Sequence, residues 1–157
     1  MDANAYFDDS GDASALRSAG QVLMQQILSA FPRFGADWEK HLEFWDGEVA
    51  GPFNDISPFA HFIDEELFNK GEIEEVRRAM LLLEELFKAG DQSTRNLIGI
   101  GFIEDLSNIT SWRPSGHSTV IPLLPETLLE VWKEIERQWA GKSSLIEVIE
   151  AERNGPH

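Results

Sequence analysis

The sequence has no cysteine, few basic residues and no long apolar run. The lack of cysteine excludes disulfide scaffolds, zinc ribbons and catalysis by a thiol. No apolar stretch is long enough to cross a bilayer, and the acidic, polar first residues differ from a signal peptide. We therefore expect a cytoplasmic protein that has no membrane partner.

Basic side chains are outnumbered by acidic ones, with 13 Lys and Arg against 28 Asp and Glu, so the formal net charge is -15. Such a field repels nucleic acid and accelerates encounter with a basic protein. The segment from Phe34 to Val76 holds twelve acidic and two basic residues, so ten of the fifteen net charges lie within it. Two interpretations stay open: a solvated acidic face, or a surface that binds a basic partner.

Apolar residues recur at helical spacing along most of the chain, and no strand-like alternation of any length accompanies them. This pattern predicts an all-α fold of about six to seven mostly antiparallel helices. At 157 residues we expect one domain over 12–153, with a disordered acidic lead-in at 1–11 and a tail at 154–157. The predicted helices start at Asp12, Gly35, Ser57, Glu72, Asp91, Pro125 and Ser144. In the third of these helices, Ser57 is the cap and Pro58 the first helical residue.

The stretch from Asp91 to Asn108 is apolar nearly all round its middle, which is typical of a buried helix. We expect this helix to lie at the centre of the domain, with Asp91 or Ser93 as its cap. Gly99 and Gly101 lie inside it, although each costs about 1 kcal/mol relative to alanine. The close approach of a neighbouring backbone is the expected compensation.

Metal and cofactor motifs are weak in this sequence. His61 and Glu65 are four residues apart, but two ligands on one helical turn do not make a metal site. The sequence from Gly99 to Gly101 lacks the third glycine and the preceding strand of a nucleotide-binding loop. His41 lies between two tryptophans on a helical stripe, which favours a packed, hydrogen-bonded histidine. We expect no metal and no cofactor.

No constellation of catalytic residues is recognisable. The adjacent carboxylates Glu104 and Asp105, like Asp64 and Glu65, diverge by about 100 degrees on a helix. Ser115 and His117 lack the strand and turn of a nucleophile elbow. The sequence therefore favours a binding protein over an enzyme.

Residues 109–124 form a long segment that contains Pro114, Gly116 and Pro122 and has no helical period. Loops of this length are uncommon in compact domains and often carry function. The segment includes Trp112 and His117. It either folds back over the helices or faces a partner or ligand.

A resemblance to a known family is found in the helix over 74–91 and in the motif that follows it. The motif consists of Gly101, Phe102, Ile103, Glu104, Asp105, Leu106 and Asn108. This middle third of the chain resembles a family of small acidic all-helical bacterial proteins. Many proteins of this type are encoded beside polymorphic toxins as immunity proteins. The resemblance implies a binding role and no catalytic residues.

These observations predict an immunity protein that binds a cognate basic bacterial toxin domain, such as a nuclease, and covers its substrate surface. The alternative is a helical adaptor or regulatory module that has no toxin partner. The sequence leaves the oligomeric state open. The predicted partner-binding residues are Asp64, Glu65, Glu66, Glu72, Glu74 and Glu75, with Trp112 and His117 as contacts from the loop.

Overall fold

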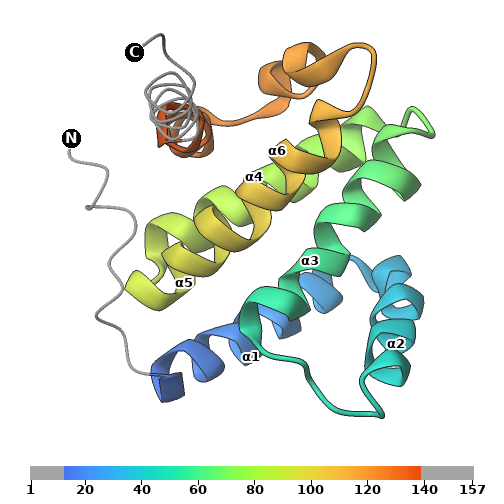
Figure 1. The fold of residues 1–157 in the computed structure, drawn as a ribbon, viewed down its shortest axis with the longest axis vertical. Coiled ribbons are helices and arrows are strands. Elements are labelled where there is room, and N and C mark those ends of the chain that lie inside the picture. Colours follow the sequence, from blue (N-terminus) through green and yellow to red (C-terminus); the bar gives the residue numbers. More distant parts are fainter. Residues whose placement is uncertain (1–12, 139–157) are drawn as a thin grey trace, which may run out of the picture.

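The computed structural model describes residues 13–138, and within that range it contains helices and no strand (Figure 1). The prediction of a single all-α domain is confirmed. The α-helices are α1 (Ala13–Ala30), α2 (Gly35–Phe44), α3 (Pro52–Phe62), α4 (Ile73–Ala89), α5 (Gln92–Asn96) and α6 (Glu104–Ser111), and another helix runs over 126–138.

Two π-helical segments extend these helices. Ile63–Phe68 continues α3, and Leu97–Ile103 joins α5 to α6, so that a single long helix runs over 92–111. Short 3-10 helices are formed by Pro32–Phe34, Gly116–Thr119 and Ile121–Leu123. Several predictions lie outside the described residues, namely the lead-in, the Asp12 cap, the helix after Ser144 and the tail.

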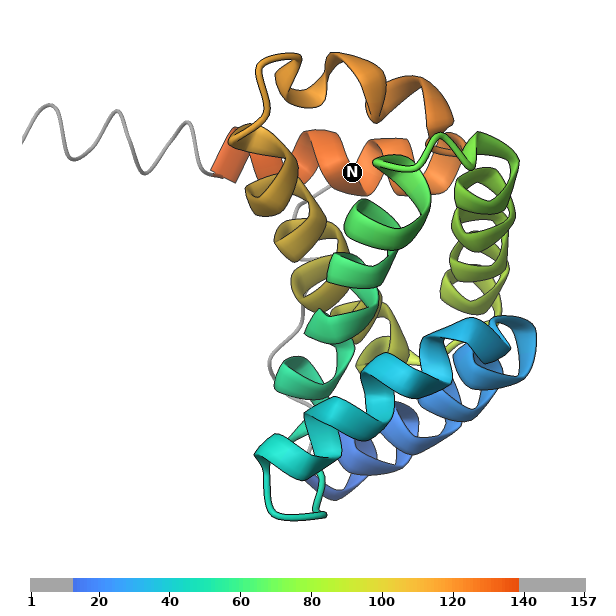
Figure 2. The ribbon, with the colours of Figure 1, turned by 90° about the vertical axis from the view of Figure 1, so that its right-hand side faces the viewer.

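The helices form three groups along the molecule (Figure 2). α1 and α2 lie side by side at one end, and the helix over 126–138 lies across the other end. Between them, α3 packs along the long helix 92–111, which also contacts α1 and α4. Over the described part of the chain, no helix is both long and apolar enough to cross a bilayer.

The long helix 92–111 is buried at its middle, as predicted, since Leu97, Ile98 and Phe102 are fully enclosed. Its start is capped by Asp91, whose carboxylate accepts the backbone N–H of Thr94 at 2.9 Å. Gly101 permits a close approach, but the approaching atoms belong to side chains rather than backbone. A Cβ at Gly101 would lie 2.7 Å from Cγ2 of Ile56, so α3 can pack this closely only against glycine.

The start of α3 differs from the prediction. The helix begins at Pro52, and Pro58, predicted to open it, lies inside it. The earlier start is stabilised by Asp55, whose carboxylate accepts the backbone N–H groups of Ala50 and Gly51 at 3.0 and 3.2 Å. Gly51 has a φ of 132° and thereby turns the chain into the helix.

The helix over 126–138 is held at its start by a residue of α4. The buried carboxylate of Glu84 accepts the backbone N–H groups of Thr127 and Leu128 at 3.3 and 2.9 Å. These N–H groups belong to the first turn, which has no partner within its own helix. An anionic acceptor also suits the positive end of the helix dipole, so Glu84 caps this helix from a distance of more than forty residues in sequence.

Candidate partner-binding surface

The six acidic residues predicted to bind a partner each lie within 4.0 Å of a different cationic or histidine side chain. The structure brings these residues together around the end of α3 and the start of α4. Most of their negative charge is balanced there by cationic side chains of the same protein. The pairs are Asp64 with Arg113, Glu65 with His61, Glu66 with Lys70, Glu72 with Arg33, Glu74 with Arg77, and Glu75 with Arg78.

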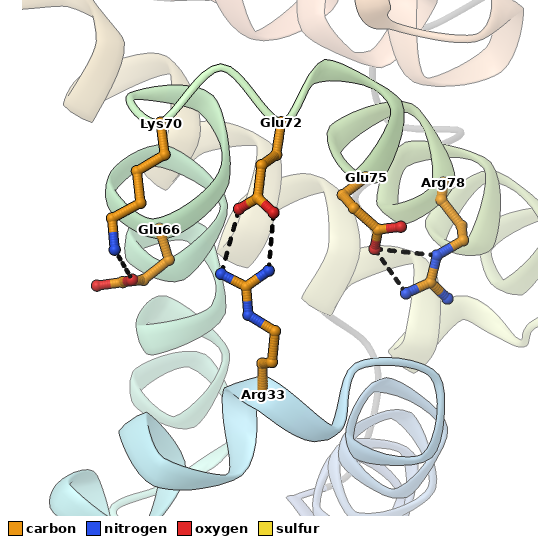
Figure 3. A network of polar contacts seen from close by, with 6 residues as sticks. All are labelled: Arg33, Glu66, Lys70, Glu72, Glu75 and Arg78. Atoms are coloured by element: carbon orange, nitrogen blue, oxygen red, sulfur yellow. Dashed lines mark hydrogen bonds and ion pairs between the residues drawn. The ribbon is translucent and has the colours of Figure 1, made fainter.

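Part of this group forms the network in Figure 3. Arg33, from the turn between α1 and α2, donates two hydrogen bonds to Glu72, at 3.0 and 3.2 Å. A hydrogen bond from Lys70 lowers the pKa of the Glu66 carboxyl, and one from Arg78 lowers that of Glu75. The Glu66 and Glu75 carboxylates are therefore ionised at neutral pH, but the field of each is offset by its adjacent cation.

Asp64 is buried and does not project outward with its neighbours. It binds the guanidinium of Arg113, which also binds the side-chain oxygen of Asn69 and lies 4.9 Å over the ring of Phe68. Arg113 follows α6, so this contact holds the start of the 112–124 segment on the π-helical end of α3. Asp64 is therefore a structural ligand of Arg113 and has little surface for a partner.

The segment over 109–124 is partly helical rather than a loop throughout, and most of it folds back over the domain. Val120, Leu123 and Leu124 are buried. His117 is also turned inward, since its Nε2 lies 3.0 Å from the carbonyl oxygen of Ser107 and its ring lies edge-on to Trp132. Trp112 differs from them, because 89% of its surface is exposed.

A second acidic surface lies at the end of α2 and in the turn that follows. Its carboxylates make no ion pair with any of the described residues. Residues 37–49 carry five acidic side chains and one lysine, so five minus one leaves a net charge of -4. We call this region the α2 surface; it comprises Glu39, Glu43, Phe44, Trp45, Asp46, Glu48 and Val49.

Large apolar side chains are exposed among these carboxylates. Phe44 is 80% exposed, and Trp45, 42% exposed, meets it edge-on with ring centroids 5.5 Å apart. Val49 is also exposed in the following turn. The sequence analysis missed this surface, because it placed the tryptophan that follows Phe44 on a helical stripe and did not single out Phe44. Aromatic side chains in an acidic setting suit contact with a basic protein.

The aromatic side chains of α2 are anchored by one histidine. The ring of His41 stacks on Trp38 at 5.4 Å, and its Nε2 donates to Asp55 of α3 at 2.8 Å. The prediction of a packed, hydrogen-bonded histidine is confirmed. The same carboxylate that fixes the start of α3 therefore also fixes the orientation of α2.

A pocket of about 250 Å³ lies beside this anchor, between α1 and the segment leading into α3. Apolar walls come from Met24, Leu28, Trp38, Val49 and Pro52, and Arg17, Gln21 and Gln25 of α1 lie along its edge. Val49 belongs both to the pocket and to the α2 surface. The two features therefore form one continuous region.

Asp105, on the long helix, is a partly buried carboxyl outside these two surfaces. Burial raises the pKa of the Asp105 carboxyl, and a hydrogen bond from Ser57 and the nearby His61 partly oppose this shift. Within residues 13–138, no three histidine or acidic side chains are grouped so that they could hold a metal ion.

One comparison with known proteins gives a match. The model of a family described as "Domain of unknown function (DUF7674)" matches residues 24–140, a range that includes the end of α1, all of α2 and the long helix. No curated protein and no solved structure matches the chain. Because the match spans well over half of the sequence, the chain belongs to the DUF7674 family of domains of unknown function.

Proposed function

We propose that the protein is an immunity protein that neutralises a basic bacterial toxin domain by binding it and covering its substrate surface. The observation that carries the proposal is the α2 surface, where Phe44 and Trp45 are exposed among carboxylates that lack ion pairs within the described chain. The resemblance of the middle third to small acidic immunity proteins also supports it.

The carboxylates and the aromatic side chains of this surface would contribute to binding in different ways. Carboxylates that are free of internal cations attract a basic protein at long range and accelerate association. Exposed aromatic side chains bury a large area on contact and therefore slow dissociation. The acidic residues around α3 and α4 contribute less to the long-range field, since all but Glu65, which lies beside His61, have a lysine or arginine partner.

No step of this function requires catalysis by the chain. A nuclease-like toxin domain binds the phosphates of its substrate with basic side chains. Carboxylates of the immunity protein that bind these same basic side chains would compete with the substrate. The protein would act in a stoichiometric complex, and the basic toxin domain would be its only required partner.

The test uses secreted-toxin genes adjacent to this gene in its host. Each toxin domain is expressed with and without the protein, and growth and the association rate of the purified pair are measured at two salt concentrations. We expect restored growth and an association rate that falls steeply with salt. If none of these toxins is neutralised, the immunity function is wrong. A partner bound with no salt dependence would favour the adaptor alternative.

Two matched charge reversals locate the surface. Glu39 and Glu43 lie on the α2 surface without ion pairs, whereas Glu65 and Glu74 are exposed but adjacent to His61 and Arg77. We expect E39K/E43K to slow association at least about tenfold at low salt. The control E65K/E74K should change it by less than about threefold. The reverse order would place the partner on α3 and α4.

A further inference from the structure

The pocket beside the α2 surface has the size of a site for one side chain. Its volume of about 250 Å³ is below the roughly 300 to 1,000 Å³ of typical small-molecule sites. Pockets of this kind at protein interfaces receive single anchor side chains, which supply much of the binding energy. Size alone therefore favours part of a protein chain over a cofactor.

The walls of the pocket are fixed before any ligand binds. Trp38 is stacked on His41, and His41 is held by Asp55. On the other side, Pro52 packs so closely on α1 that a Cβ at Gly20 would lie 3.2 Å from its Cβ. A preformed pocket loses little conformational entropy on binding, which favours affinity.

The polar groups that line the pocket are Asp55 and, along its edge, Arg17, Gln21 and Gln25 of α1. Asp55 is the one carboxylate among its lining residues, and both of its oxygens already accept hydrogen bonds, from His41, Ala50 and Gly51. The remaining walls are mostly apolar, from Met24, Leu28, Trp38 and Val49. An apolar side chain therefore fits this pocket better than a charged one.

The surroundings indicate which residues accompany that side chain. Val49 joins the pocket to the α2 surface, whose net charge of -4 attracts lysine and arginine. A second copy of this chain would bring the same negative charge to the contact, which disfavours self-association there. Charge complementarity therefore points to a basic partner.

From these observations, and resting on the proposed function, we infer that the pocket binds one large apolar side chain of the partner, phenylalanine or leucine, next to a lysine or arginine that contacts the α2 carboxylates. The partner segment would thus combine an apolar anchor with adjacent positive charge. The pocket would determine which basic proteins are bound, whereas the carboxylates would set the rate of association.

The test uses the full chain labelled with 5-fluorotryptophan, which gives one fluorine signal for each of its five tryptophans. The signal of Trp38 is assigned with Trp38→Phe. Three capped tripeptides are titrated: Lys-Phe-Lys, Lys-Ala-Lys and Glu-Phe-Glu. We expect Lys-Phe-Lys to shift the Trp38 signal at millimolar concentration, and the other two peptides to bind at least about tenfold more weakly.

Two variants with the same chemical change provide the control. Gln21 lies at the edge of the pocket, whereas Gln26 is exposed on α1 and is not among the residues that line it. Gln21→Phe should fill the pocket from its edge and abolish the Trp38 shift. Gln26→Phe should leave the shift unchanged. Both positions are exposed, so both variants should fold.

Each result bears on one part of the inference. No Trp38 shift with Lys-Phe-Lys at about 10 mM, or an equal shift in Gln21→Phe, would overturn the pocket as an anchor site. If Lys-Ala-Lys binds as tightly as Lys-Phe-Lys, the pocket does not bind an apolar side chain. If Glu-Phe-Glu binds as tightly, the site does not prefer a basic segment. If the peptide binds but no toxin is neutralised, the pocket stands and the immunity function fails.

Discussion

The Nε2 atom of His41 lies 2.8 Å from Oδ1 of Asp55, and this contact connects α2 to the start of α3. The same carboxylate accepts the backbone N–H groups of Ala50 and Gly51. It therefore fixes the turn between the helices, the first residues of α3 and, through the His41 ring, the Trp38 wall of the pocket. The candidate binding region depends on this one side chain.

Replacing Asp55 with alanine should lower the free energy of unfolding by about 3 kcal/mol, because three donors in a partly buried site lose a charged acceptor. Urea unfolding monitored by circular dichroism measures this change. Glu43→Ala, at an exposed position of α2, is the control and should stay within about 0.5 kcal/mol of the parent. A loss below about 1 kcal/mol for Asp55→Ala would show that water replaces the carboxylate.

Helical periodicity was sufficient to predict the all-α fold and the buried centre of the helix over 92–111. The start of α3 was predicted wrongly because two proline signals compete. Ser57 and Pro58 resemble a cap and first turn, but Gly51 and Pro52 offer the same signature, and Asp55 supports the earlier start. Pro58 lies in the second turn of α3, where its missing N–H leaves the carbonyl of Asn54 without a helical donor.

The charge pattern could be counted from the sequence, and so could the pairs three or four residues apart, such as Glu66 with Lys70, but the long-range pairs could not. Arg33 and Glu72 are 39 residues apart, and Arg113 and Asp64 are 49 apart, so only the tertiary fold brings them together. These two contacts pair Glu72 and Asp64, two of the six acids that the sequence favoured as binding residues. The α2 surface has the opposite property: its carboxylates lie at the end of the molecule where no described cation reaches them.

Gly101→Ala should destabilise the protein, although alanine normally stabilises a helix by about 1 kcal/mol relative to glycine. The new Cβ would lie 2.7 Å from Cγ2 of Ile56, a branched side chain that cannot turn away. We expect a net loss of about 1–3 kcal/mol in urea unfolding.

A double-mutant cycle identifies the cause of that loss. In an Ile56→Ala background the contact is absent, so Gly101→Ala should become neutral or stabilising. Gly35→Ala is the control, because nothing lies within 4 Å of a Cβ there. An unchanged penalty in the Ile56→Ala background would place the strain elsewhere.

Glu84 shows how spacing alone can mislead. It lies four residues before Lys88, a spacing typical of an exposed ion pair, yet its carboxylate is buried and caps the helix over 126–138. Glu84→Ala should cost about 2–3 kcal/mol, because two backbone N–H groups lose their acceptor. Hydrogen exchange at Thr127 and Leu128 should accelerate. The neighbouring Glu85→Ala should affect neither quantity, and slow exchange retained in Glu84→Ala would contradict the cap.

The cap residue Asp91 should stabilise the protein less as the pH falls. Hydrogen bonds from the backbone and side chain of Thr94 lower the pKa of its carboxyl below the ordinary value of an aspartate. Its stabilising contribution is therefore present above the unfolded pKa and is lost as pH falls through the folded pKa. Asp91→Ala should cost about 1 kcal/mol at pH 7 and progressively less below pH ~4. A cost that does not change with pH would show that the carboxylate charge plays no part.

Asp105, on the long helix that Asp91 caps, should have the opposite effect: its contribution to stability should fall as the pH rises. Burial raises the pKa of its carboxyl above 3.8, so the folded state retains the proton to a higher pH than the unfolded chain. Between the two pKa values stability falls as pH rises, and above the folded pKa the ionised carboxyl imposes a constant cost. Asp105→Asn keeps an acceptor for Ser57 but cannot ionise, so it should be more stable than the parent at pH 7 and lose that advantage below pH ~4. Urea unfolding at neutral and acidic pH measures the difference, and a less stable variant at pH 7 would show that the charged form is the one the fold favours.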